Sequence, residues 1–162
     1  MKHILTFTAL LVTLFIVHGT VQDAYAQPMG YNFGIGGQLG DPSGLSLEYY
    51  PGGGGVFGSD SYEFLLWWDT DGNFDHFAAN IHALFDRPLS GAPLDFYYGP
   101  GFFLGFYERP GDDGIYAGIS GQFGLAFDID RFEIFGHLTP RLAIAPDTDG
   151  DLGGGIGARF YF

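Results

Sequence analysis

Residues 94–107 read Leu-Asp-Phe-Tyr-Tyr-Gly-Pro-Gly-Phe-Phe-Leu-Gly-Phe-Tyr, and they alternate between two kinds of side chain. The even positions are large and apolar, apart from one proline. The odd positions hold an acid, glycines and further aromatic residues. Successive side chains of a β-strand point to opposite faces of a sheet, so this period of two predicts a strand with one apolar face.

The same alternation recurs on both sides of this stretch. It is found at 31–39, 45–50, 61–68, 76–85, 115–128, 131–144 and 151–162. Turn sequences rich in Asp, Pro, Asn and Gly separate the stretches, for example Asp41-Pro42-Ser43-Gly44. The chain therefore predicts an all-β fold of eight antiparallel strands.

Two architectures share this pattern, and they differ in which face is inside. A soluble secreted barrel points its apolar face inward, whereas a transmembrane barrel points it at lipid. Here the polar face is rich in glycine and lacks lysine, and aromatic residues gather near the ends of the apolar face. A narrow lumen needs small residues, and lipid interfaces favour aromatic girdles. The pattern favours an eight-stranded antiparallel transmembrane β-barrel, with the soluble barrel as an alternative.

Composition excludes several other classes. The chain has 162 residues, 28 glycines, no cysteine, and 19 acidic against 6 basic side chains, a net charge of −13. The lack of cysteine excludes a disulfide scaffold and a thiolate metal site. The acidic balance argues against a nucleic-acid partner. The high aromatic content argues against disorder.

The first 26 residues are typical of a secretory signal peptide. Lys2 and His3 precede an apolar run at 4–17, and Ala24-Tyr25-Ala26 provides a small-x-small cleavage site. The apolar run is too short for a membrane-spanning helix, which needs about 20 residues. We expect cleavage after Ala26, which leaves 27–162 as a single barrel domain.

The final strand alternates apolar residues up to its last position, with Ile156, Ala158, Phe160 and Phe162 on one face. It resembles the C-terminal assembly signal of bacterial outer-membrane proteins, which the barrel assembly machinery reads. The stretch 34–50, with its Gly40-Asp41-Pro42-Ser43-Gly44 turn, is similar to the opening hairpin of small eight-stranded outer-membrane barrels in spirochaetes and Bacteroidetes-like bacteria. Those barrels are mostly of unassigned function. At the position of Glu48 those barrels often carry a Lys, so no role of that Lys can be assigned to this chain.

The resemblance implies a bacterial outer-membrane location. The partners it implies are outer-membrane lipid, the barrel assembly machinery and periplasmic chaperones. It leaves the oligomeric state open.

Charged and histidine side chains on the inward face form the main candidate site. They are Glu48, Glu63, His82, Asp95, Glu133, His137, Arg141 and Arg159. Buried charges need partners, so we expect a lumenal network of ion pairs and hydrogen bonds that fills a narrow barrel. The alternative is a path for protons or ions.

Two turns suggest a cation site at the outer end. Both read Asp-Thr-Asp-Gly, and their carboxylates are Asp69, Asp71, Asp147, Asp149 and Asp151. Alternating carboxylates around a glycine resemble the first half of a calcium loop, but the closing Glu is missing. Asp-Gly is also ordinary turn chemistry, so we expect no metal and no cofactor.

These features predict a structural or unassigned membrane role and no enzymatic activity. Alternatives are a narrow pore for small solutes and a lipid-modifying enzyme, although no serine lies in a recognisable catalytic motif. Pro100 and Pro140 fall inside strands and remove ladder donors. We therefore expect a local bulge at each of them.

Overall fold

The computed structural model describes residues 30–70, 75–90, 93–109 and 112–162. The predicted signal peptide, 1–26, lies outside these residues. The strands are β1 (Phe33–Asp41), β2 (Gly44–Tyr49), β3 (Ser61–Thr70), β4 (Asp75–Pro88), β5 (Leu94–Arg109), β6 (Asp112–Ile129), β7 (Phe132–Ala145) and β8 (Asp149–Tyr161). A short 3-10 turn, η2 (Val56–Gly58), lies between β2 and β3.

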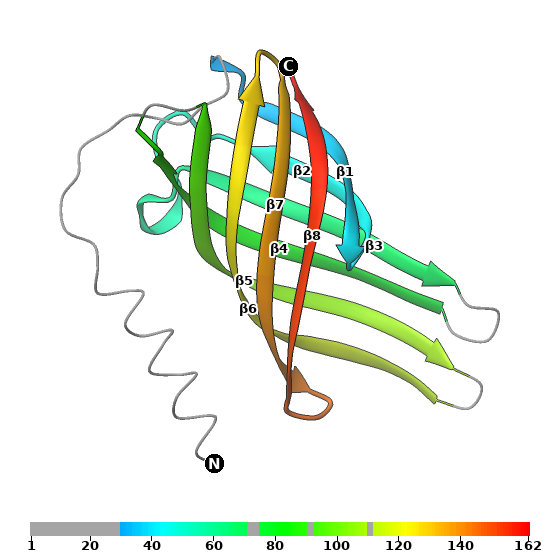
Figure 1. Cartoon of the computed structure of the whole chain (residues 1–162). Helices are drawn as coiled ribbons and strands as arrows, with labels where there is room; N and C mark the ends of the chain where they lie inside the picture. The colour runs from blue at the N-terminus through cyan, green and yellow to red at the C-terminus, as the bar shows by residue number, and fades with distance from the viewer. Residues whose placement is uncertain (1–29, 71–74, 91–92, 110–111) are drawn as a thin grey trace.

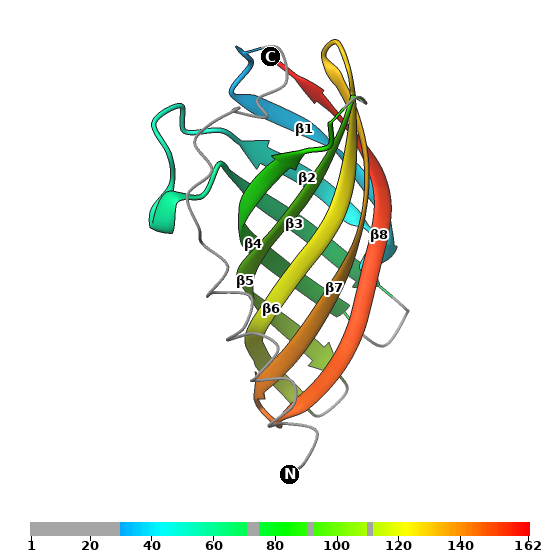
Figure 2. The ribbon, with the colours of Figure 1, turned by 60° about the vertical axis from the view of Figure 1, so that its left-hand side comes forward.

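The eight strands form a closed antiparallel barrel in chain order (Figure 1). The barrel closes because β1 pairs with β8, from Gly34 opposite Tyr161 to Asp41 opposite Gly154. Figure 2 shows the tilted strands of the wall side by side. The predicted all-β, eight-stranded antiparallel barrel is confirmed. Closure pairs the two strands that would otherwise be sheet edges.

Burial follows the alternation of the sequence, with polar side chains inside. On β7, Glu133, Phe135, His137 and Thr139 are buried, whereas the intervening Ile134 and Leu138 are exposed. The lumen holds buried polar and charged groups, and the outer wall carries exposed Phe, Leu and Ile. This is the reverse of a water-soluble domain. No helix among the described residues is long and apolar enough to cross a membrane.

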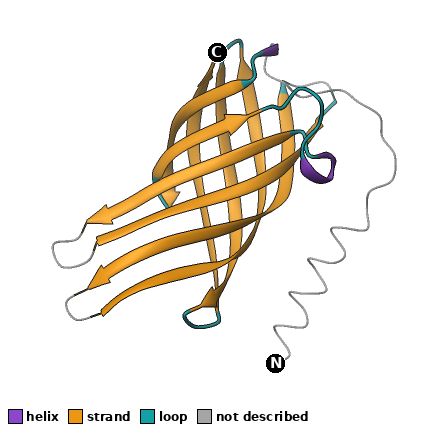
Figure 3. Cartoon of the chain, turned by 180° about the vertical axis from the view of Figure 1, so that it is seen from behind, coloured by secondary structure: helices purple, strands orange, loops and turns teal. Residues whose placement is uncertain are grey.

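The wall of the barrel is taller on one side. β5 pairs with β6 as far as Arg109 opposite Asp112, but β6 pairs with β7 only from Ala117. Likewise, β3 pairs with β2 only as far as Trp67, whereas it pairs with β4 as far as Thr70 opposite Asp75. The hairpins β3–β4 and β5–β6 therefore diverge from β7–β8 at the end of the barrel opposite the C-terminus (Figures 1 and 3).

Many lumenal aromatic rings lie over a glycine that is directly opposite on the neighbouring strand. These glycine–aromatic pairs are Gly34 with Tyr161, Gly105 with Tyr116, Gly114 with Tyr107, Gly118 with Phe103, Gly124 with Tyr97 and Gly157 with Phe135. A Cβ on Gly124, for example, would lie 2.2 Å from the Tyr97 ring. The missing side chain makes room for the ring, so glycine lets large rings fill a narrow lumen.

The expected bulges at Pro100 and Pro140 are wrong. The β4–β5 ladder is interrupted opposite Pro100, and the β6–β7 ladder opposite Pro140, but both resume in the same register. The register shift lies instead between Ala117 and Gly118, near the open end. A bulge in mid-strand would turn every later side chain to the other face, whereas losing one ladder bond leaves the faces intact.

The packing of Tyr97 over Gly124 predicts that Gly124→Ala destabilises the barrel by about 1–3 kcal/mol, the usual cost of overpacking. Gly121→Ala on the same strand is the matched control, because its nearest contacts would be 3.8–4.0 Å away. Urea unfolding of the refolded proteins in lipid vesicles measures both. Equal midpoints for the two variants would contradict the role of the pair.

Candidate functional site

A buried arginine connects four strands across the lumen. Arg159 on β8 donates Nη1 hydrogen bonds to Glu48 Oε2 (2.7 Å) on β2 and to Glu133 Oε1 (2.6 Å) on β7. Its Nη2 bonds Glu63 on β3, and its Nε donates to Ser46 Oγ at 2.8 Å. Each carboxylate is almost fully buried. The guanidinium presents several donors in a fixed plane, so it can hold several carboxylates together. We call Arg159, Glu48, Glu63 and Glu133 the central cluster.

One cation cannot neutralise three carboxylates, and neutral donors complete the central cluster. The Tyr161 hydroxyl donates toward Glu48 Oε2 (2.6 Å) and Glu133 Oε2 (3.0 Å). Ser61 donates to Glu48 Oε1 at 2.7 Å, and the Gln122 amide donates to Glu63 Oε1 at 2.8 Å. These bonds stabilise buried carboxylate oxygens that have lost their water.

The two predicted lumenal histidines have separate partners. His82 Nε2 lies 2.9 Å from Ser120 Oγ. His137 Nδ1 lies 2.6 Å from the Gln122 amide nitrogen and 3.1 Å from the Tyr97 hydroxyl. Gln122 therefore links His137 to the central cluster, whereas His82 is engaged by Ser120.

Ser120, His82 and Glu63 are the residue types of a catalytic triad, in which a nucleophile, a base and an orienting acid contact one another in turn. The geometry does not complete such a triad. His82 Nδ1 is 4.0 Å from Glu63 Oε1, too far for a hydrogen bond, and has no hydrogen-bond partner among the described residues. Glu63 is instead engaged by Arg159 and Gln122. All three side chains are buried, so we interpret them as lumen packing.

Asp95 lies near the end of the barrel that holds the C-terminus. It is half-buried and lines a void of about 10 Å³ together with Asp86, Asp128 and members of the central cluster. A void of this size holds about one water molecule. The structure thus places Asp95 beside the central cluster, across this void. Among the described residues, no hydrogen bond joins Asp95 to the central cluster.

Arg141 lies at the opposite end of the lumen, where the hairpins diverge. Its Nε and Nη2 donate to the two carboxylate oxygens of Asp151 (2.7 and 2.8 Å), and Nη2 also lies 3.2 Å from Asp41 Oδ1. Arg141 is therefore separate from the central cluster.

Of the calcium candidates, Asp151 contacts the Arg141 guanidinium. Asp149 accepts a bond from the Gly150 amide. Asp147 is exposed in the β7–β8 turn. The described residues contain no group of three or more acidic or histidine side chains that could hold a metal. Asp71 and the Asp69 side chain lie outside the described structure.

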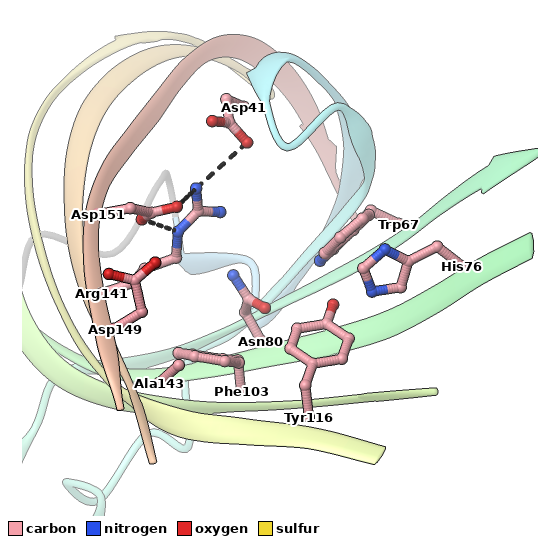
Figure 4. Close-up of a pocket in the computed structure, with 10 residues that line it drawn as sticks. All are labelled: Asp41, Trp67, His76, Asn80, Phe103, Tyr116, Arg141, Ala143, Asp149 and Asp151. Atoms are coloured by element: carbon pink, nitrogen blue, oxygen red, sulfur yellow. Dashed lines mark hydrogen bonds and ion pairs between the residues drawn. The ribbon is translucent and has the colours of Figure 1, made fainter. Parts of the chain in front are cut away.

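A cavity of about 260 Å³ lies beside Arg141 (Figure 4). One wall consists of aromatic rings from the tall side of the barrel, Trp67, His76, Tyr116 and Phe103. The other wall carries Arg141 with Asp41, Asp149 and Asp151, and Asn80 lies between the walls. We call this space the mouth cavity.

The residues of the expected assembly signal face outward. Ile156, Ala158 and Phe162 are exposed, and Phe160 is half-buried against Phe132, with ring centroids 5.1 Å apart. Phe162 contacts Phe33 of β1 edge to face at 5.4 Å. The last residue is therefore tied to the start of the first strand.

Sequence reasoning singled out the charged members of the network but not its neutral donors. Tyr161, Gln122, Ser61, Ser46 and Ser120 all lie at inward positions of the alternation. The alternation of the sequence places these side chains on the inward face. Only the register of the paired strands shows that each lies level with a carboxylate or a histidine. The mouth cavity was also missed, since it depends on where the pairing of neighbouring strands stops.

Comparison with known proteins adds little. No protein-family model matches the chain, and no curated protein is similar to it. Among solved structures it is similar to the crystal structure of Neisserial surface protein A (NspA), with 13% identity, a TM-score of 0.45, and coverage of 81% of this chain and 94% of that chain. A likeness at this level says nothing about activity.

The central cluster predicts that Arg159→Met destabilises the barrel by about 3–5 kcal/mol, because three buried carboxylates lose their cation. Arg159→Lys keeps the charge but loses the planar donors, so it should fall between wild type and Arg159→Met. Denaturant unfolding in lipid vesicles provides the measurement.

Arg87→Met is the matched control for this prediction. Arg87 is half exposed and pairs with Asp60 at 3.4 Å on the rim. Such a pair contributes at most about 1 kcal/mol. If Arg159→Met cost no more than Arg87→Met, the central cluster would not be the main polar support of the lumen.

Proposed function

We propose that the protein is an integral β-barrel of a bacterial outer membrane, with a lumen filled by side chains and a structural role in that membrane. The observation that carries this proposal is the inverted arrangement of the barrel. Charged groups are buried inside, and the wall is covered by large apolar side chains. Water penalises such a wall, whereas hydrocarbon favours it.

The apolar side chains form a belt around the middle of the barrel. Phe102 on β5 is 52% exposed, and it lies beside Ile81 of β4 and Ile119 of β6 in the pairing register. Ile134 on β7 and Ile156 on β8 are further large apolar side chains exposed on the wall. Soluble monomers rarely expose contiguous apolar patches larger than a few hundred Å². A lipid environment accounts for the belt without requiring a partner protein.

Outward aromatic rings gather at the end of the barrel that holds the C-terminus. Phe132, Phe160, Phe162 and Phe33 contact one another in series. Two exposed arginines lie over rings at the same end, Arg87 over Tyr98 and Arg131 over Tyr31. Aromatic rings with nearby arginines are typical of the interface between lipid tails and headgroups. This end supports a position at the periplasmic membrane surface.

The central cluster supports a closed lumen rather than a conduit. Arg159 reaches side chains of β2, β3 and β7, so ion pairs cross the interior at its level. Between the cluster and the end that holds the C-terminus, the described residues line a small void that holds about one water. We further propose that the protein is not an enzyme and takes no cofactor. Its partners would be outer-membrane lipid and, during assembly, periplasmic chaperones and the barrel assembly machinery.

Membrane embedding predicts that Phe102→Arg reduces folded stability by about 2–4 kcal/mol, because a charge near the bilayer midplane is costly. Phe57→Arg is the control, since Phe57 is 84% exposed but lies in η2, outside the strands. Unfolding in vesicles and resistance of the native protein to carbonate washing report on both variants. Release of the wild type by carbonate, together with equal stability of the two variants, would favour a soluble secreted barrel.

A closed lumen also predicts no steady conductance. Purified protein in planar lipid bilayers should give a flat current trace at all applied voltages, with a general porin as the positive control. Stable channel steps that depend on protein concentration would support the narrow pore and contradict the filled lumen.

A further inference from the structure

The mouth cavity exists because the barrel wall is taller on one side. β3, β4, β5 and β6 continue past the last residues that pair with β2 and β7. Their inward side chains near this level, Trp67, His76 and Tyr116, therefore face the ends of β7 and β8 across an open space (Figure 4). The cavity of about 260 Å³ has room for roughly nine waters. That is enough for a small ring-shaped solute, and less than the ~300–1,000 Å³ of drug-sized sites.

The aromatic wall is a packed cluster of rings in tilted and edge-to-face contact. The His76 ring lies 4.5 Å from both Trp67 and Tyr116, and Phe103 contacts Tyr116 at 5.8 Å. Rings that hold one another in this way offer a ligand a rigid apolar surface at low entropic cost. A planar or ring-shaped ligand with exposed C–H groups suits it.

Two polar atoms of this wall have no hydrogen-bond partner among the residues that the structure describes. They are the Trp67 indole nitrogen and the Tyr116 hydroxyl, both buried. Figure 4 shows the nitrogen end of Trp67 facing Asn80, and the Tyr116 oxygen pointing toward Trp67 and His76. Unsatisfied buried donors are costly and call for a partner. An acceptor oxygen on a ligand provides one.

The opposite wall sets the charge of the ligand. Asp41, Asp149 and Asp151 face one cation, Arg141, which is engaged by Asp41 and Asp151. Among the residues that the structure describes, Asp149 accepts a hydrogen bond from the amide of the neighbouring Gly150 and is not paired with Arg141. The excess of carboxylates disfavours an anion and favours a neutral or cationic group. Carboxylates and the Asn80 amide also match hydroxyl groups as hydrogen-bond partners.

We propose that the mouth cavity binds a single neutral or amino sugar ring. The apolar face of a pyranose packs on the aromatic wall, and its ring substituents reach Trp67, Tyr116 and Asn80 on one side and the carboxylates on the other. An amino group of the sugar lies toward Asp149. The ligand is either a free monosaccharide or the terminal unit of a longer glycan at the membrane surface.

Tryptophan fluorescence tests this proposal directly, since the chain has two tryptophans. Trp68 points outward from the barrel and is replaced in a Trp68→Phe background, so that the signal comes from Trp67. The folded protein in detergent is titrated with D-glucose, D-glucosamine and D-glucuronate, which differ mainly in charge. We expect saturable changes, with glucosamine binding most tightly and glucuronate most weakly. The methyl glycoside of glucosamine distinguishes a free monosaccharide from a terminal glycan unit as the ligand. The anomeric oxygen of a terminal glycan unit is substituted, so a site for such a unit must also bind the methyl glycoside.

Two further variants locate the site. Tyr116→Phe removes one hydroxyl and should weaken binding roughly two- to tenfold, the effect of one hydrogen bond. Tyr49→Phe is its control, because Tyr49 lies on the outer wall. Asp149→Asn should reduce the preference for glucosamine over glucose and leave glucose binding in place. The absence of a saturable change with all the sugars, tightest binding of glucuronate, or equal affinity in Tyr116→Phe and wild type would overturn the proposal.

Discussion

The structure depends on the interaction of Arg159 with three buried glutamates. Each strand of the barrel is paired with its neighbours by ladder bonds, but the ladder alone does not determine what fills the interior. The guanidinium reaches Glu48, Glu63 and Glu133 on three other strands. It thereby joins opposite sides of the wall through contacts that are distant in sequence. Because the interior has little water, any loss of this cation leaves carboxylates that cannot be solvated.

The glycine–aromatic pairs and the central cluster are two solutions to one constraint, the small diameter of an eight-stranded barrel. At some levels a ring from one strand covers a glycine on the next, as Tyr97 covers Gly124. At the level of the central cluster, toward the end that holds the C-terminus, charged and polar groups satisfy one another. Tyr161 joins the two solutions, since its ring covers Gly34 and its hydroxyl bonds Glu48. The interior combines these polar groups with a small buried apolar cluster of Leu84, Tyr97, Ala126 and Phe135, while many of the remaining large apolar residues cover the outer wall.

The two ends of the barrel differ in a way that follows from strand length. At the end that holds the C-terminus, neighbouring strands finish at similar levels, and aromatic rings surround the wall. At the other end, β3 continues beyond its pairing with β2 and β6 continues beyond its pairing with β7, and the mouth cavity opens there. The lumen is therefore filled toward one end and open at the other, which is the basis of the binding that we propose for the mouth cavity.

The sequence alone predicted the number of strands, their antiparallel order and which side chains share a face, because the period of two appears in every strand; which face lies inside was decided by the structure. It also identified the charged members of the lumen, such as Glu133 and Arg159. Tertiary structure decided which of these groups meet, because partners such as Gln122 and Glu63 lie 59 positions apart and their level depends on register. It also decided that Pro100 and Pro140 leave the register intact, and that a cavity forms where unequal strands stop pairing. Periodicity is a local property of a strand, whereas register and strand height are set only when the barrel closes.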